Sequence, residues 1–175
     1  MVYQFKITSI EKPDFVRIIE IDAQNSFADF HWSIQECCQY SSDQLASFFI
    51  AGNKYGKQTE ITFLDYGING SQTQIMGKTK LRDILSNTGL RLLYVFDFFN
   101  DRSFYIELTK VYMEKHLQET KITNKQGDAP SQVLEAEIQD QGQIILEQEN
   151  MYQDYGDLDD YTEIFGEMED LIEGD

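Results

Sequence analysis

Charge is distributed very unevenly along this chain of 175 residues. Residues 1–125 contain all 14 Lys and Arg and 15 of the 31 Asp and Glu, for a net charge of −1. Residues 126–175 contain the other 16 acidic residues and no basic one. A segment of one sign repels itself and has no ion pairs of its own with which to surround a packed core. We therefore expect one folded domain in residues 1–132 and an acidic C-terminal tail in residues 133–175.

Alternation of apolar and polar residues predicts strands in much of the N-terminal part. Residues 3–8 and 15–21 show β-rich patterns on either side of a turn at 11–14, and further β-rich runs occupy 45–51 and 60–65. A short helix is expected at 81–85. No internal repeat with a period of about 20–50 residues is visible, so a solenoid is not expected.

One amphipathic helix is predicted between the first two pairs of strands. Ser26 followed by Asp29 is a helix-capping signal. Behind it, one helical stripe contains Phe27, Phe30, His31, Ile34, Cys37 and Cys38. We expect a helix of about four turns on one face of the sheet. The predicted fold class is α+β, a β-grasp-like mixed sheet covered by one long helix, followed by the acidic C-terminal tail.

The stretch YVFDFFNDRSFYIELTKV at 94–111 predicts two long strands joined by a short polar corner. Residues 90–99 are apolar on both faces, which is typical of a central strand covered on both sides. Residues 103–109 alternate, so only one face of the second strand need be buried. Asn100 and Asp101 tolerate the left-handed backbone that a tight hairpin needs. We interpret the corner as a hairpin end.

Three polar residues are candidates for a catalytic or metal site. His31 lies on the apolar stripe of the predicted helix, where a buried structural histidine is the alternative to a general base. Asp97 and Asp101 could form a carboxylate pair that transfers protons or binds a hard metal ion. The alternative is that Asp97 forms a structural ion pair with Arg91 or Arg102, and that Asp101 is an ordinary turn residue.

The sequence lacks the common catalytic motifs. Neither G-x-G-x-x-G nor G-x-x-x-x-G-K-[ST] occurs, and G-x-S-x-G and H-E-x-x-H are missing as well. Two histidines and two adjacent cysteines leave too few residues for the usual nucleophile or zinc sites. We predict no catalytic residue, no metal and no cofactor.

Cysteine usage and hydropathy indicate the compartment. Cys37 and Cys38 are neighbours, and because a disulfide between neighbours is strained, we expect reduced thiols in a reducing compartment. The N-terminal MVYQFKITSI lacks the pattern of a signal peptide, and no run of about 18 apolar residues occurs. We expect a cytoplasmic protein without a membrane segment.

The acidic tail contains one patterned segment, residues 161–172. Its apolar residues fall on one helical stripe: Tyr161, Ile164, Phe165, Met168, Leu171 and Ile172. Gly166 lowers helix propensity there by about 1 kcal/mol. Such an acidic amphipathic segment can dock on its own domain, stay disordered, or insert into a groove on a partner.

Charge also restricts the class of partner. Direct binding to duplex nucleic acid is disfavoured because it relies on cations that displace counterions from phosphate. A basic protein partner would be attracted. We therefore hypothesise a non-enzymatic interaction module whose acidic tail docks in cis or on a basic partner. The alternative is a metal-dependent or hydrolytic enzyme that uses Asp97 and Asp101.

Several short motifs in a fixed order resemble the plasmid pRiA4b ORF-3-like family. They are Pro13-x-x-x-Arg17, Phe27-x-x-Phe30-His31-x-x-Ile34-Gln35, Leu45-x-x-Phe48, Tyr94-Val95-Phe96-Asp97-Phe98 and Ile106-x-Leu108, within residues 3–112. The run Gly127-x-Ala129-Pro130-x-Gln132 resembles a further C-terminal piece. The resemblance implies an α+β fold found in bacterial, archaeal and mobile-element proteins, and it implies no established activity.

This chain departs from the hairpin of that family. The family hairpin resembles Y-D-F-G-D-x-W-x-H, and the departing residues here are Phe96, Phe99, Asn100, Arg102 and Phe104. Any polar or catalytic role of the corner in relatives is therefore mostly lost, whereas Asp97 and Phe98 are kept. This combination favours a retained fold over a retained site.

Overall fold

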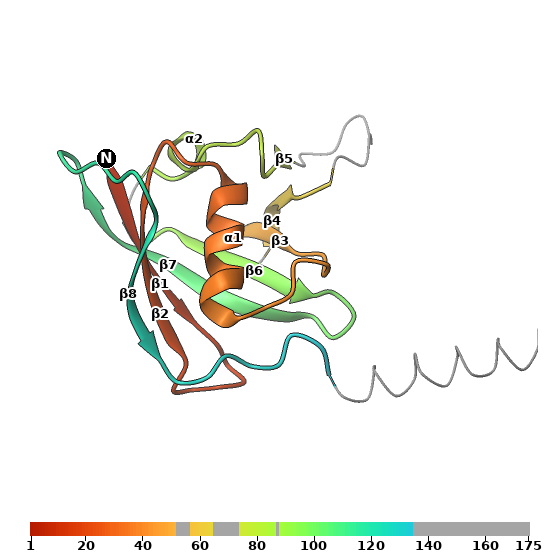
Figure 1. Cartoon of the computed structure of the whole chain (residues 1–175). Coiled ribbons are helices and arrows are strands. Elements are labelled where there is room, and N and C mark those ends of the chain that lie inside the picture. The colour runs from red at the N-terminus through yellow and green to blue at the C-terminus, as the bar shows by residue number, and fades with distance from the viewer. Residues whose placement is uncertain (52–56, 65–73, 87, 135–175) are drawn as a thin grey trace, which may run out of the picture. The chain divides into compact units, whose positions relative to one another are not determined.

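A computed structural model describes residues 1–51, 57–64, 74–86 and 88–134 (Figure 1). The chain divides into two units after Gln132, and almost all described residues belong to the first. The elements of this unit follow the order β1 (Val2–Thr8), β2 (Val16–Asp22), α1 (Phe27–Cys38), β3 (Ser47–Ala51), β4 (Lys57–Thr62), β5 (Gln74–Ile75), α2 (Leu81–Ile84), β6 (Arg91–Asp97), β7 (Arg102–Tyr112) and β8 (Lys121–Gln126).

The strands form one sheet in the order β5-β4-β3-β6-β7-β1-β2-β8. All neighbours pair antiparallel except β4 and β5, so the sheet is mixed. β1–β2, β3–β4 and β6–β7 are neighbours in both sequence and space. The longest strand, β7, pairs with β6 on one side and β1 on the other and joins the two halves of the sheet.

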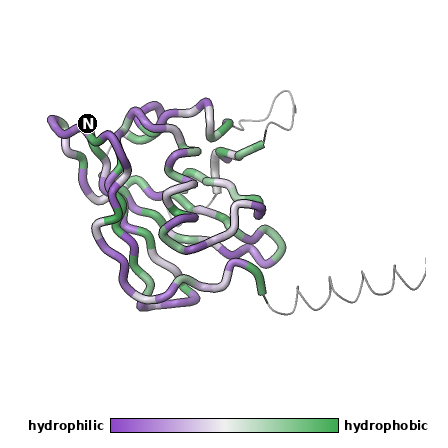
Figure 2. Tube along the Cα trace, in the orientation of Figure 1, coloured by the Kyte–Doolittle hydropathy of each residue, from purple (hydrophilic) through white to green (hydrophobic). Residues whose placement is uncertain are grey.

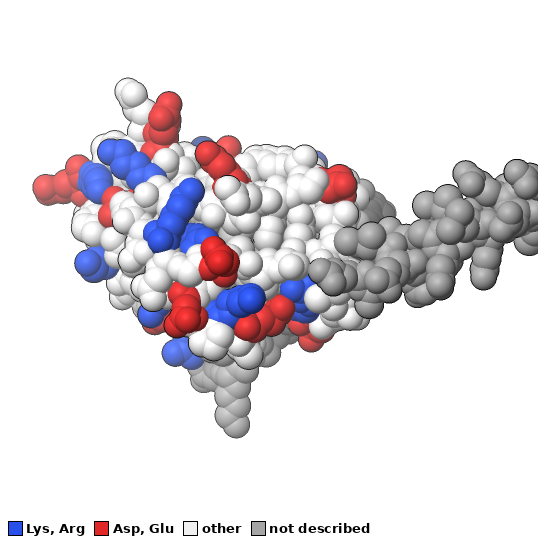
Figure 3. Space-filling model, turned by 60° about the horizontal axis from the view of Figure 1, so that its bottom comes forward, with Lys and Arg blue, Asp and Glu red and all other residues white. Residues whose placement is uncertain are grey.

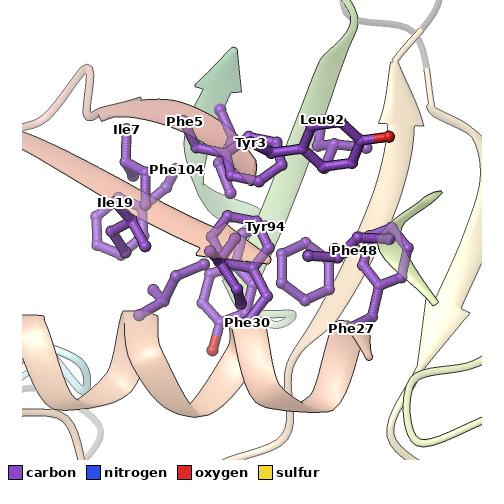
Figure 4. Packing of buried hydrophobic residues seen from close by; sticks show 14 of the residues in the cluster. Tyr3, Phe5, Ile7, Ile19, Phe27, Phe30, Phe48, Leu92, Tyr94 and Phe104 are labelled. Atoms are coloured by element: carbon purple, nitrogen blue, oxygen red, sulfur yellow. The ribbon is translucent and has the colours of Figure 1, made fainter. Parts of the chain in front are cut away.

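Helix α1 lies against one face of this sheet (Figure 1). Its predicted cap is confirmed, since the Ser26 hydroxyl accepts from the Asp29 N–H and the Asp29 carboxylate accepts from the Ser26 N–H. The helix ends at Gln39, which has a left-handed φ of 59°. Phe30 stacks between Phe5 of β1 and Phe48 of β3, with ring centroids 4.5 and 5.4 Å away (Figure 4). Helix and sheet thus share one aromatic core.

Strand β6 is central and buried on both faces, as its sequence predicts. Tyr94 packs toward α1, and Leu93 and Val95 on the opposite face are buried too. The strand ends at Asp97, however, earlier than the apolar run indicated. Phe98 and Phe99 belong to the turn and are exposed rather than buried.

The predicted fold class is wrong, because the protein is mainly β. The described residues contain eight strands but only two helices, of 12 and 4 residues. A 12-residue helix is about 18 Å long, whereas eight strands spaced at about 4.8 Å span about 34 Å. Among the described residues, no long helix covers the sheet. Strand β1 has antiparallel neighbours on both sides, so the sheet is not β-grasp-like. The sequence KITNKQ of β8 lacks apolar alternation because this edge strand is mostly exposed, which is why it was missed.

The two cysteines at the end of α1, Cys37 and Cys38, are buried free thiols with their Sγ atoms 3.9 Å apart. Among the described helices, none has the length and apolar character needed to cross a membrane.

Candidate functional site

The polar corner between β6 and β7 is a tight turn that Asp97 ties together. Its Oδ1 accepts from the Asn100 backbone N–H at 3.1 Å, and its Oδ2 accepts from Asn100 Nδ2 at 2.9 Å. Asp101 takes up the left-handed backbone of the turn, with φ 51°, which Asp tolerates better than most residues. The two candidate carboxylates therefore have different roles in one hairpin end.

Arg102, the first residue of β7, connects this turn to two other segments. Its Nη1 donates to Asp97 Oδ2 at 3.3 Å, and its Nε and Nη2 form a fork with Glu11 of the β1–β2 turn, at 2.8 Å for Nη2–Oε2. Nη2 also donates to the Ser131 carbonyl at 2.6 Å, and Nη1 to the Gln132 carbonyl at 3.3 Å. With 9% exposure, Arg102 is a nearly buried cation whose donors are directed at oxygen atoms from three segments.

The ionisation of Asp97 and Arg102 follows from this pairing. Burial alone would raise the pKa of Asp97, but the hydrogen bonds from Asn100 and Arg102 outweigh it and leave the pKa below its usual range. Burial would lower the pKa of Arg102, but hydrogen bonds and charges from Glu11 and Asp97 outweigh it and raise the pKa. Both groups are charged at neutral pH and stabilise each other.

Residues 126–132, which we name the strap, form the last part of the folded unit (residues 1–132), which we call the body. Side chains from the rest of the body bind the strap. At its first end, Arg17 Nη1 donates to the carbonyls of Gln126 and Gly127 at 2.7 and 2.9 Å. Gly127 has φ +64°, and a Cβ there would lie 2.6 Å from the Asp14 carbonyl oxygen. Glycine is needed here for both conformation and space.

The other end of the strap is held at the C-terminus of α1. Tyr40 Oη donates to the Pro130 carbonyl at 2.7 Å. The Gln132 side chain pairs with the Ser41 backbone, with Oε1 accepting from N–H at 2.7 Å and Nε2 donating to the carbonyl at 2.9 Å. Together with Arg102, these bonds fix the chain up to Gln132, one residue before the acidic segment. The motif Gly127-x-Ala129-Pro130-x-Gln132 thus coincides with the strap.

His31 belongs to a separate network beneath α1. Its Nδ1 lies 2.9 Å from Tyr94 Oη, and this hydroxyl oxygen accepts from Gln35 Nε2 at 3.4 Å. His31 is 3% exposed, and burial lowers its pKa to about 4. At neutral pH the ring is uncharged, with Nδ1 placed to accept the Tyr94 proton. The Gln35 Oε1 atom is buried and has no hydrogen-bond partner among the described residues.

The three polar candidates therefore occupy two networks. Asp97 and Asp101 lie in the hairpin turn, and His31 lies with Tyr94 under the helix. Within the described ranges, no group of three or more His, Cys, Asp or Glu residues is arranged to hold a metal ion. The interaction candidates Tyr161, Ile164, Phe165, Met168, Leu171 and Ile172 lie outside the described residues.

Sequence reasoning missed most of the Arg102 network. Arg102 is one of the two alternative partners predicted for Asp97, and the structure places Arg102 there. No role is predicted for Glu11, because Glu11 is 91 residues from Arg102 in the chain. The pairing of β1 with β7 brings the two together, and no local pattern encodes that pairing.

Comparison with known proteins identifies a family and a similar fold among solved structures. The family model described as "Plasmid pRiA4b ORF-3-like protein" matches residues 1–165. The structure of a protein of unknown function, MM3350 from Methanosarcina mazei Go1, is similar with a TM-score of 0.55 and 23% identity, over 71% of this chain and 68% of that chain. At this identity the likeness concerns the fold alone. No match was found among curated proteins.

Proposed function

Because the chain belongs to the plasmid pRiA4b ORF-3-like family, whose description states no activity, we propose its function from its own residues. The protein is a non-enzymatic interaction module that binds a basic protein partner through residues 133–175. The observation that carries the proposal is the segregation of charge, since residues 1–125 have a net charge of −1 whereas residues 133–175 contain 15 acids and no Lys or Arg. Such a segment attracts a positively charged surface over a range of about 8–10 Å in physiological salt.

The body supports a scaffold role. On the face shown in Figure 3, Lys and Arg are interspersed with Asp and Glu, and residues 1–125 have a net charge of only −1, so this part of the chain has a weak overall field. The strap fixes the chain as far as Gln132 through bonds from Arg17, Tyr40 and Arg102. The last residue before the acidic segment, Gln132, is therefore held in place by the folded unit.

The polar corner gives little support to the enzymatic alternative. A general acid or base needs access to substrate and a pKa near the working pH. Asp97 is 8% exposed, its pKa is lowered, and both of its oxygens accept hydrogen bonds from Asn100 and Arg102. These hydrogen bonds stabilise the β6–β7 turn, so Asp97 has a structural role there.

The proposal is tested with two synthetic helical peptides and the full chain. The Lys/Leu peptide has a lysine face and a leucine face, and the Lys/Ser peptide replaces every leucine with serine. We expect fluorescence anisotropy to show tighter binding of the Lys/Leu peptide, because residues 161–172 combine acids with an apolar stripe. Changing Glu163, Glu167 and Glu169 to Gln should weaken binding about tenfold, which corresponds to about 0.5 kcal/mol for each of three ion pairs with the peptide.

A matched variant controls for net charge. Glu36, Glu114 and Glu119 are exposed acids of the body, and changing all three to Gln removes the same charge. Equal loss of binding in both triple variants would show that only net charge matters and would sink the proposal. Loss of binding after truncation at Gln132, with body resonances unchanged in a proton-nitrogen spectrum, supports binding in trans. Shifted body resonances would instead indicate docking in cis.

A further inference from the structure

Exposed large apolar side chains gather at one end of the sheet. The described residues contain eight of them, and six follow or precede strands at the same end: Ile10, Leu45, Phe63, Leu64, Phe98 and Phe99. Trp32 of α1 joins this set through Phe63, with ring centroids 5.5 Å apart. Only Met113 lies at the opposite end, after β7.

Strand pairing places these residues along one line. Phe63 follows Thr62 of β4, whose partner Ser47 of β3 follows Leu45 by two residues. Ser47 also pairs with Val95 of β6, just before Phe98 and Phe99. The end of β1 pairs with the start of β7, so Ile10 follows in the same row. We name this row the sheet-end surface.

The tip of the β6–β7 hairpin is its most exposed part. Phe99 is 97% exposed and Phe98 46% exposed, and Figure 2 shows hydrophobic green beside hydrophilic purple at this tip. The turn that holds them is tied by Asp97, Asn100 and Arg102. An aromatic side chain on a turn that is already held in place loses less conformational entropy on binding. Aromatic side chains of this kind are typical anchors of protein interfaces.

The charges around this surface are mostly acidic. Its connecting segments, residues 9–15, 39–46, 63–64, 98–101 and 127–132, contain five acids and one Lys. These are Glu11, Lys12, Asp14, Asp43, Asp101 and Asp128, all exposed. Arg102, which lies beside this surface, is nearly buried and pairs with Glu11 and Asp97. An apolar row with an acidic border complements an apolar surface with a basic border.

We propose that the sheet-end surface is a second contact site for the basic partner, with Phe98 and Phe99 inserted into an apolar area bordered by Lys or Arg. This inference rests on the proposed function and deepens it. The strap ends beside the hairpin turn, because Arg102 contacts both that turn and the Gln132 carbonyl. A partner that binds both sites gains affinity, because its second contact forms within an existing complex.

The test uses the full chain, the Lys/Leu peptide and two variants. Phe98 and Phe99 are changed to Ser together, and Met113, which is 71% exposed at the opposite end, is changed to Ser as the control. The double variant should bind about tenfold more weakly, as expected for losing partial burial of two aromatic rings. The Met113→Ser chain should bind like the original. Circular dichroism verifies that both variants stay folded, as is expected for exposed positions.

The outcomes separate the two proposals. If the Glu163/Glu167/Glu169 variant weakens binding while the Phe98/Phe99 variant does not, the sheet-end inference fails and the proposed function stands. If the Phe98/Phe99 variant alone weakens binding, the inference holds and the acidic segment loses its role. If sedimentation velocity shows a dimer that the Phe98/Phe99 variant converts to a monomer, a second copy covers the surface and the inference is overturned.

Discussion

Arg102 joins three segments that are far apart in the sequence. It contacts Glu11 in the β1–β2 turn, Asp97 in the hairpin turn and the carbonyls of Ser131 and Gln132 in the strap. Glu11 is 38% exposed at its side chain, whereas Asp97 is nearly buried. Removing the cation would therefore leave Asp97 as the uncompensated charge, and that determines the energetic cost.

We predict that Arg102→Met lowers the free energy of unfolding by about 3 kcal/mol, because a buried carboxylate loses its charged partner. Methionine keeps an apolar stem beside Phe96, whose ring centroid lies 5.0 Å from the guanidinium carbon. Urea unfolding measures the loss. The matched control is Arg82→Met, since Arg82 and its partner Asp83 are both exposed and 3.7 Å apart, and it should cost less than about 0.5 kcal/mol. Similar losses for both variants would contradict the account of Arg102.

His31 gives a prediction about pH. Its pKa is about 4 in the folded protein, below the ordinary value of 6.5. The unfolded chain therefore takes up a proton first as the pH falls, and stability decreases between about pH 6.5 and 4 and levels off below that. The loss amounts to about 3 kcal/mol, at about 1.4 kcal/mol per pKa unit.

The measurement is urea unfolding of the wild-type chain and of His31→Gln at several pH values. Glutamine keeps a hydrogen-bond acceptor for Tyr94 but does not titrate, whereas Asp97 and the other carboxylates titrate in both chains. The stability of wild type relative to the variant should fall as the pH is lowered from 7 to 4. A constant difference over this range would show that His31 is not held neutral by burial.

Among the elements, the strap is held along its length by hydrogen bonds from Arg17, Tyr40 and Arg102. Its glycine provides a sharp test, because the chain contains a second positive-φ glycine with open space around it. A Cβ at Gly127 would meet the Asp14 carbonyl oxygen at 2.6 Å, whereas at Gly89, with φ +84°, nothing lies within 4 Å.

Gly127→Ala should destabilise the fold more than Gly89→Ala. Both variants incur the strain of a left-handed alanine, about 1–2 kcal/mol, and only Gly127→Ala adds overpacking, about 1–3 kcal/mol. Urea unfolding compares the two, and hydrogen exchange of residues 126–132 should speed up in Gly127→Ala alone. Equal destabilisation with unchanged exchange would mean that the strap does not need this close approach.

The elements also show how far the sequence could predict the structure. The capping pair Ser26 and Asp29, the buried central strand β6 and the hairpin turn at Asn100 and Asp101 depend on local patterns, and the structure confirms them. The fold class failed because strand β8 has no apolar alternation, and because a stripe of apolar residues does not show how large a sheet the helix must cover. The Arg102 network depends on pairing between distant strands, which local patterns do not contain.

For the whole molecule, the core formed by the described residues lies within residues 1–132. If residues 133–175 serve a partner in trans, truncation after Gln132 should change the free energy of unfolding by less than about 0.5 kcal/mol, the range of surface changes. Urea unfolding of the full and truncated chains decides this. A larger loss of stability would show that the acidic segment is part of the fold.

Salt should affect binding more than folding. Residues 1–125 have a net charge of −1, so the stability of the body should change little with ionic strength, whereas attraction between the acidic segment and a lysine-rich peptide is screened. Anisotropy titrations of the Lys/Leu peptide should show an affinity that falls steadily as salt increases. An affinity that does not depend on salt would indicate that the acids are not the contact.

The central claim is that this chain holds a basic partner through its acidic C-terminal part. The most direct measurement is a proton-nitrogen correlation spectrum of the full chain during titration with the Lys/Leu peptide. The account predicts shifts throughout residues 133–175, together with a smaller set at Leu45, Phe98 and Phe99. If residues 133–175 keep their resonances while the peptide binds elsewhere, the claim is contradicted.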